Sequence, residues 1–255
     1  GRSLLLSYGM MKPGRSPFQT SSIVRMSIAD GRVDTLINDT TYLAGAKFSP
    51  DAKSLLITAS PNAFDGIGRE VKEGQTPNAF DYRLYLYDIA KQETTPLLPN
   101  FAPSVDRVEW SATDGQVYFM ATDGCDKSLF RLNPSSLKCE KFDLPVSCLQ
   151  GYSIALNQKQ PTAVFFGQTG ERAREMFMAT LNSTQPKCKR IGETDFDEMY
   201  RNVAIGSCHD WKFLSSRGDS INGFYFLPPN FDANQKYPLI VYYYGGCTPT
   251  TKALE

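Results

Sequence analysis

Short runs of β-forming residues, separated by clusters of Gly, Pro, Asn, Asp and Ser, continue from the start of the chain to about residue 192. Helical periodicity is almost absent from this region, and short strands separated by turn residues are typical of an all-β domain. The runs predict four successive sets of strands: 4–7, 22–28 and 32–37; 45–49, 54–59, 83–89 and 94–98; 105–111, 116–122, 128–132 and 139–144; 150–156, 162–167, 176–181 and 187–192.

These sets resemble one another in sequence. Residues 46–57 (AKFSPDAKSLLI) align with residues 107–118 (RVEWSATDGQVY), and a degenerate third copy begins at residue 152. A repeated unit of four antiparallel strands is typical of a β-propeller blade. The fold class predicted for residues 1–193 is therefore mainly β, a partial β-propeller of about four blades. Because the first set lacks its first strand, we expect further blades upstream.

One loop is longer than the repeat requires. Residues 61–80 contain the phrase PNAFD twice, on either side of a charged stretch. Long insertions in a regular repeat often carry function. Arg69, Glu70 and Glu73 are therefore candidate substrate-binding residues, and an insertion that only covers surface is the alternative.

The character of the chain changes after Gly192. Residues 194–209 are interpreted as a linker, with a short helical turn capped by Thr194 or Asp195. Residues 210–215 and 221–228 predict a hairpin. The apolar run 239–244, between Pro238 and the pair Gly245-Gly246, predicts a strand buried on both faces.

Composition excludes several classes of protein. With 41% hydrophobic and 21% charged residues the chain is globular, and 27 basic residues balance 27 acidic ones. A nucleic-acid partner would call for a basic excess, so none is expected. No window of about 18 apolar residues predicts a membrane span, and the N-terminus has no signal-peptide pattern.

The six cysteines show no C-x-x-C spacing, and the chain has one histidine, so no metal site is expected. If residues 127–134 and 138–145 form a hairpin, Cys125 and Cys148 lie nearly opposite each other beyond its strands. They are either a disulfide or two buried free thiols.

The order of these elements resembles the prolyl oligopeptidase family of serine peptidases. The resemblance is generic over the blades and more specific over WKFLSSRGDSINGFYFLPPNFD and KYPLIVYYYGG, and it points to the dipeptidyl peptidase IV and acylaminoacyl peptidase branches. It implies that residues 210–255 are the first strands of a truncated α/β-hydrolase domain. The full-length protein would then cleave short peptides through an acyl-enzyme, without a cofactor, while the propeller gates and orients the substrate. The resemblance favours a periplasmic or secreted location and leaves a homodimer open.

Tyr244 is the catalytic residue that the resemblance implies within this chain. Family members carry His or Tyr before the Gly-Gly pair, and the Tyr hydroxyl donates a hydrogen bond to the oxyanion of the tetrahedral intermediate. The alternative is one more buried aromatic in the Tyr242-Tyr243-Tyr244 run. The sequence departs from the family at Cys247, where Pro is common.

The catalytic triad is not in this chain. No G-x-S-x-G elbow occurs, so the nucleophile, Asp and His are expected after residue 255, and the chain alone should be inactive. His209 precedes the predicted hydrolase strands and is interpreted as a surface or linker residue. The acidic motif that grips a free amino terminus in dipeptidyl peptidase IV is not recognisable. A non-catalytic β-propeller binding module is the alternative function.

Overall fold

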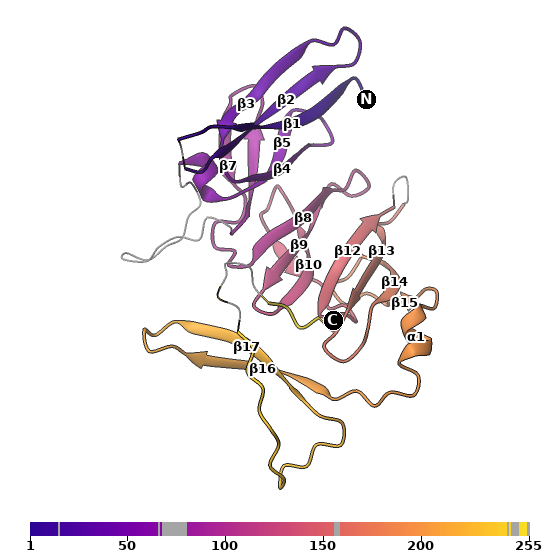
Figure 1. Ribbon diagram of the computed structural model, residues 1–255. Coiled ribbons are helices and arrows are strands. Elements are labelled where there is room, and N and C mark those ends of the chain that lie inside the picture. Colours follow the sequence, from indigo (N-terminus) through magenta and orange to yellow (C-terminus); the bar gives the residue numbers. More distant parts are fainter. Residues whose placement is uncertain are drawn as a thin grey trace. The chain divides into compact units, whose positions relative to one another are not determined.

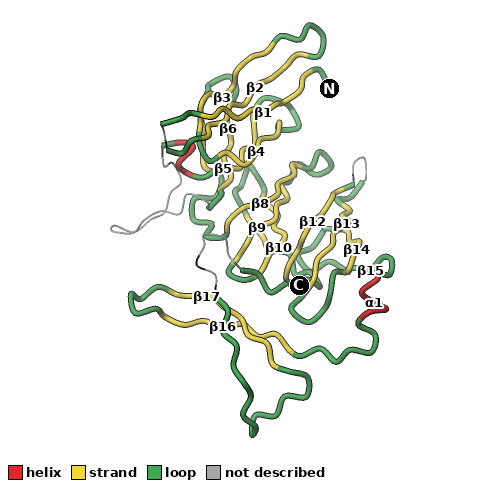
Figure 2. Tube along the Cα trace, in the orientation of Figure 1, coloured by secondary structure: helices red, strands yellow, loops and turns green. Residues whose placement is uncertain are grey.

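The computed structural model describes residues 1–14, 16–65, 67, 81–155, 159–243, 245 and 250–253. Strands dominate the described chain, and helical segments are short (Figure 2). Internal contacts divide the chain into two compact units. The first contains Gly1–Phe119 and Leu132–Cys139, and the second contains Met120–Arg131 and Glu140–Glu255. The mainly β fold class predicted from the sequence is confirmed.

The first two sheets belong to the first unit (Figure 1). A three-stranded antiparallel sheet has the order β1-β2-β3, and a four-stranded antiparallel sheet has the order β4-β5-β6-β7. Their bounds are β1 Ser3–Met11, β2 Gln19–Ser27, β3 Val33–Thr40, β4 Leu43–Phe48, β5 Ser54–Ala59, β6 Arg83–Asp88 and β7 Glu93–Pro96. The second sheet has the four-stranded meander of a propeller blade.

The next two sets of strands follow the same plan. β11 pairs with β10 in the order β11-β10-β9-β8, and β12 to β15 pair in chain order. A single parallel bridge, Lys127 with Cys148, joins the two sets. Their bounds are β8 Ser104–Trp110, β9 Val117–Asp123, β10 Asp126–Leu132, β11 Cys139–Lys141, β12 Cys148–Ile154, β13 Thr162–Gln168, β14 Glu175–Thr180 and β15 Lys189–Arg190.

The sequence repeat reappears in the hydrogen bonds of its turns. The Ser49 amide donates to the Ser54 carbonyl at 2.9 Å, and in the second repeat the Ser111 amide donates to the Gln116 carbonyl at the same distance. A left-handed residue lies in each turn, Ala52 with φ 57° and Gly115 with φ 71°. The two loops have four residues each and are closed by the same hydrogen bond, although the left-handed residue is third in the first loop and fourth in the second.

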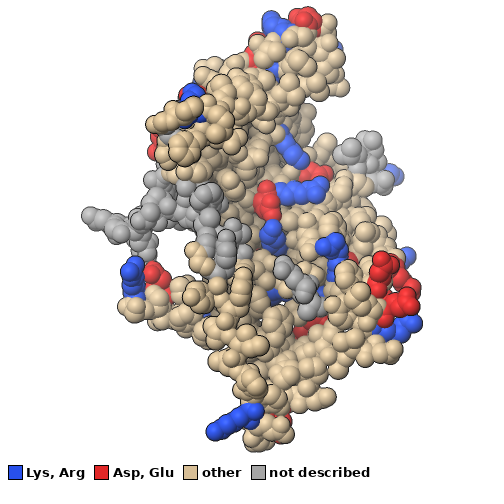
Figure 3. Space-filling view, in the orientation of Figure 1, with Lys and Arg blue, Asp and Glu red and all other residues tan. Residues whose placement is uncertain are grey.

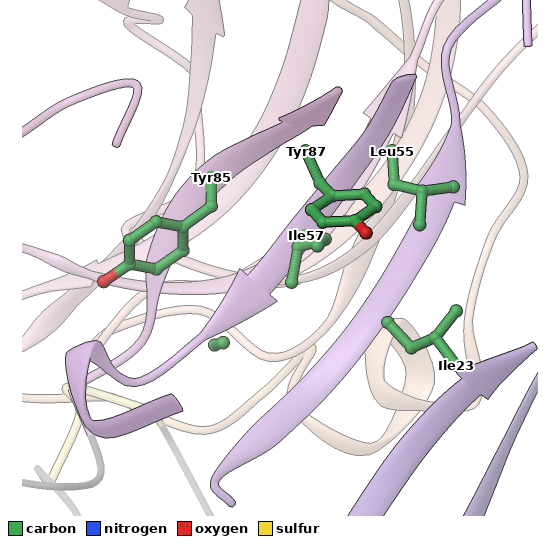
Figure 4. Close-up of a cluster of buried hydrophobic side chains, with 6 residues drawn as sticks. Ile23, Leu55, Ile57, Tyr85 and Tyr87 are labelled. Atoms are coloured by element: carbon green, nitrogen blue, oxygen red, sulfur yellow. The ribbon is translucent and has the colours of Figure 1, made fainter. Parts of the chain in front are cut away.

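The core of the first unit is built by residues that alternate along neighbouring strands (Figure 4). Leu55 and Ile57 of β5, Tyr85 and Tyr87 of β6 and Ile23 of β2 form one buried cluster. The Tyr87 hydroxyl donates to the Leu36 carbonyl at 2.8 Å, so burial leaves its polar atom satisfied.

The region after Gly192 forms its predicted helix and hairpin. The α-helix α1, Asp195–Met199, begins after Thr194, whose side chain forms a capping box with Asp197. β16, Ser207–Leu214, and β17, Ser220–Leu227, pair antiparallel from Ser207 with Leu227 to Leu214 with Ser220. β16 begins three residues before the predicted hairpin boundary.

The prediction of a buried strand over 239–244 is wrong for its described part. Residues 239–243 form no strand, and Leu239, Ile240 and Tyr243 are 85%, 91% and 85% exposed. A strand covered on both faces needs neighbouring strands for its backbone groups and other elements for its faces. No described element pairs with this run, and it is open to solvent.

Charged side chains are interspersed on the face of the molecule shown in Figure 3, as the balanced composition predicts. Within the described residues, no helix has the length and apolar character needed to cross a membrane.

The buried cluster yields a stability prediction. Ile57 is 0% exposed, so Ile57→Ala should lower the free energy of unfolding by about 2–5 kcal/mol, through lost burial and the cavity left behind. Ile57→Val should cost only about 0.5–1.5 kcal/mol. Urea denaturation measures both. Val164, 39% exposed on β13, provides the control Val164→Ala, and equal losses at the two sites would contradict the assigned core.

Candidate functional site

The residues predicted to carry function belong to the 61–80 insertion and to the Gly-Gly segment near the end of the chain. Tyr244, Arg69, Glu70 and Glu73 all lie outside the described residues. The structure does describe residues that flank them, and it describes a cluster of ion-paired side chains that no sequence pattern predicts.

The start of the 61–80 insertion is firmly attached to the first unit. The 3₁₀ helix η1, Pro61–Phe64, is capped by the Ser60 hydroxyl, which accepts from the Asn62 amide at 3.2 Å. The ring of Phe64 packs on Tyr85 at 4.8 Å, and the Tyr85 hydroxyl donates to the Ile67 carbonyl at 2.9 Å. The first residues of the insertion, Pro61–Phe64, are therefore packed against β6 of the blade.

Lys252 has the least exposed side chain among the ion-pair partners that the structure describes in the second unit. Its side chain is 13% exposed, and its Nζ lies 2.8 Å from Asp126 Oδ1 and 2.8 Å from Asp210 Oδ1. Its backbone amide also donates to the carbonyl of Cys125 at 3.0 Å. We call Lys252, Asp126 and Asp210 the Lys252 cluster. No sequence pattern predicts this cluster, because its members are far apart along the chain.

Separate elements supply the members of the Lys252 cluster. Asp126 begins β10 directly after a tight turn in which Gly124 has φ 62°. Asp210 lies in the middle of β16 and is exposed over 68% of its side chain, against 31% for Asp126. The Lys252 ammonium group therefore joins three segments. These are the turn before β10, the β16–β17 hairpin and the C-terminal segment.

The electrostatics of the Lys252 cluster favour a permanently charged lysine. Burial by itself lowers the pKa of Lys252, but the attraction of the Asp126 and Asp210 carboxylates outweighs burial and holds the pKa well above the ordinary lysine value. A lysine in this state is a poor general base, since it does not give up its proton near neutral pH. It is suited to hold carboxylates in place.

Two further contacts join β16 to the turn between β13 and β14, next to the Lys252 cluster. The Cys208 amide of β16 donates to Glu171 Oε1 at 2.8 Å. A Cβ built on Gly170 would lie 2.4 Å from Cys208 Sγ and 3.4 Å from the Lys252 carbonyl oxygen. Only glycine leaves room for Cys208 of β16 to approach the turn between β13 and β14 this closely, whereas the Lys252 carbonyl is at ordinary contact distance.

Beside the Lys252 cluster lies a depression of about 610 Å³. It shares Asp126 with the cluster, and its other charged lining residues are Lys141, Asp143 and Arg172. Lys141 pairs loosely with Asp123 at 3.5 Å, and Arg172 donates to the Pro145 carbonyl at 2.7 Å. Both signs of charge therefore face one open space, as a site for a zwitterionic or peptide ligand requires.

The single histidine makes no triad among the described residues. His209 Nε2 is hydrogen-bonded to Ser207 Oγ at 2.7 Å, and the imidazole stacks on Tyr225 at 5.2 Å. Ser207 and His209 are two apart on β16 and so lie on the same face of the strand. His209 is exposed, as predicted. Within the described ranges no group of three His, Cys, Asp or Glu side chains is arranged to hold a metal ion.

The proposed Cys125–Cys148 disulfide is not formed. Both residues are buried free thiols, and Cys148 Sγ lies 3.9 Å from the Cys125 carbonyl oxygen. Burial raises the pKa of each thiol, because the surroundings disfavour a thiolate. The expected hairpin is present, since the Phe142 amide donates to the Leu129 carbonyl at 2.9 Å. The alternative of two buried thiols is therefore confirmed.

Comparison with solved structures shows a known fold. The Pyrococcus horikoshii acylaminoacyl peptidase superimposes with a TM-score of 0.63 at 15% identity, over 93% of this chain and 33% of that one. A likeness at this identity shows the fold alone.

Curated relatives are more specific. The dipeptidyl-peptidase 5 of Porphyromonas gingivalis is 22% identical over 200 residues, which covers 78% of this chain and 26% of the relative. A probable dipeptidyl-peptidase 5 of Aspergillus flavus is 25% identical over 214 residues, covering 78% and 25%. No family model matches the sequence. The chain spans about a quarter of the length of these relatives, and the predicted resemblance to the prolyl oligopeptidase family is confirmed.

The thiols give a chemical prediction. At neutral pH, iodoacetamide should alkylate Cys125 and Cys148 at least about tenfold more slowly in the native protein than in urea, because burial blocks access and keeps them protonated. The rate should rise as the pH approaches their raised pKa values. Peptide mapping by mass spectrometry measures each site. A cross-linked Cys125–Cys148 peptide under non-reducing conditions would show instead that the pair is oxidised.

Proposed function

We propose that this chain is part of a serine-type peptidase that cleaves short peptides through an acyl-enzyme. The observation that carries the proposal is the similarity to dipeptidyl-peptidase 5 over 78% of the chain. The similarity to acylaminoacyl peptidase, with a TM-score of 0.63, supports it at the level of fold.

In this proposal the propeller binds and orients the substrate. The depression beside the Lys252 cluster carries Lys141 and Arg172 together with Asp143. A short peptide has a positive amino end and a negative carboxyl end, so a site lined by both signs of charge can fix its direction. The dipeptidyl-peptidase relatives make release of dipeptides the first specificity to test.

Tyr244 supplies one half of the oxyanion hole in the same proposal. Acyl transfer places a negative charge on the carbonyl oxygen, and a preorganised hydroxyl stabilises this charge more in the transition state than in the substrate. The Ser-Asp-His triad comes from the full-length protein, since the sequence given contains no G-x-S-x-G elbow.

The first test is covalent labelling. A fluorophosphonate probe should label a serine of the full-length protein and leave the 255-residue chain unlabelled, because the probe needs an activated serine nucleophile. Labelling of the short chain at a serine would overturn the assignment of the nucleophile. A full-length protein that is neither labelled nor active on dipeptidyl or acylaminoacyl substrates would favour the non-catalytic binding module.

The second test is Tyr244→Phe in the active full-length protein. Loss of one oxyanion donor should lower kcat by about 10²–10³ with little change in KM. Tyr243→Phe is the matched control, because Tyr243 is the adjacent tyrosine and is 85% exposed. Steady-state kinetics on a chromogenic dipeptide substrate measure both variants. A kcat near wild type for Tyr244→Phe would remove this hydroxyl from the mechanism.

A further inference from the structure

The Lys252 cluster lies beside the two buried thiols of the second unit. Cys125 directly precedes Asp126 in the chain. Its carbonyl oxygen accepts from the Lys252 amide at 3.0 Å and from the Cys148 thiol at 3.9 Å. We propose that residues 250–253 form a strap over the thiols of Cys125 and Cys148, and that the Lys252 ion pairs hold this strap closed. The proposal concerns access to the thiols and stands independently of peptidase activity.

Two residues of the strap contact the thiol pair. Lys252 reaches the main chain of Cys125 through its amide, and the Thr251 side chain hydrogen-bonds to the Cys148 thiol. Burial raises the pKa of Cys148, and the hydrogen bond from Thr251 opposes this rise. With the strap in place, Cys125 and Cys148 are 9% and 2% exposed. Since atoms in contact with a thiol exclude water from that side, the strap supplies part of the cover over the pair.

Charge pairing, more than main-chain bonding, attaches the strap. Residues 250–253 belong to no helix or strand, and the main-chain hydrogen bond described for them is the one from Lys252. The Lys252 ammonium group lies 2.8 Å from a carboxylate oxygen of Asp126 and 2.8 Å from one of Asp210. Segments with few main-chain hydrogen bonds open locally at a low free-energy cost. The two ion pairs therefore determine how often the strap opens.

Removal of the ammonium group weakens this attachment. Asp126 and Asp210 would then face each other without a cation between them, and like charges in a partly buried site repel. The repulsion favours the state in which the strap is open and water solvates both carboxylates. Because an open strap uncovers Cys148, the alkylation rate of this thiol should report the fraction of open molecules.

Site-resolved alkylation of the full-length protein tests the strap. With iodoacetamide at neutral pH, Lys252→Met should raise the rate at Cys148 at least about tenfold. Lys252→Arg should stay within about threefold of wild type, because a guanidinium can pair with both carboxylates. Lys91→Met is the control, because Lys91 is 68% exposed and its distance to Asp88 is 3.9 Å. A Cys148 rate in Lys252→Met equal to that in the control would overturn the proposal.

Cys125 separates an opened strap from a simple change in charge. Burial raises the pKa of Cys125, and the positive charge of Lys252 opposes this rise. Loss of that charge alone would leave the thiol more protonated and slow its alkylation. An open strap has the opposite effect, so Cys125 should react at least about threefold faster in Lys252→Met than in wild type. A slower or unchanged rate at Cys125 would contradict the strap.

Cys188 shows whether damage in a variant extends beyond the strap. Its thiol donates to the Pro186 carbonyl at 3.4 Å, and its surroundings also include the charge of Asp143. It is therefore an internal reference, whose alkylation rate should change less than about twofold in Lys252→Met.

A milder variant decides the case in which Lys252→Met also speeds the reaction of Cys188. Asp210 is 68% exposed, and Asp210→Ala leaves Lys252 paired with Asp126. This variant should raise the Cys148 rate by about threefold or more while the Cys188 rate stays at its wild-type value. An unchanged Cys148 rate would overturn the strap. A rise shared by Cys188 would equally overturn it, since the cluster would then stabilise the whole unit.

Discussion

Strands that are apolar on both faces are the constraint on which this structure depends. Leu55, Leu56 and Ile57 are consecutive in β5 and at most 2% exposed, and Val117 to Phe119 of β9 are 0% exposed. Successive side chains of a strand point to opposite faces, so such a strand needs cover on both. Stacked blades provide that cover, as β8 does for β5 and β6 in the first unit. Each blade is then stable through its neighbours rather than alone.

The turns at the strand ends lie outside the packed core, so their side chains are free to form polar contacts and binding sites. In the second unit, the turn before β10 presents Asp126 and the Cys125 carbonyl to Lys252, and the turn after β13 approaches Cys208 through Gly170. The side chains of Lys252 and Asp126 are 13% and 31% exposed, and partial removal from water makes their pairing more selective for one geometry. The thiols of Cys125 and Cys148 lie nearby and have no cationic partner that outweighs burial. Burial raises their pKa values, so they stay neutral, whereas Lys252 stays charged.

Local chemistry explains which elements could be predicted. The β16–β17 hairpin follows from two β-forming runs around Ser-Arg-Gly-Asp, where Gly218 takes φ 84°. Helix α1 follows from Thr194 and Asp197 at capping-box spacing. The Lys252 cluster carries no such signal, because Asp126, Asp210 and Lys252 each look like an ordinary surface charge in the sequence. Only their convergence distinguishes them, and convergence is a property of the fold.

The sequence by itself determined the strand pattern, the blade repeat, the hairpin after α1 and the resemblance centred on Tyr244, because turn residues and apolar spacing act over a few positions. The tertiary structure decided what depends on distant partners. It left Cys125 and Cys148 as thiols, brought Lys252 to two carboxylates, and left the apolar run 239–243 exposed. The physical reason is that a strand, a disulfide or an ion pair forms only where the rest of the chain supplies the other half.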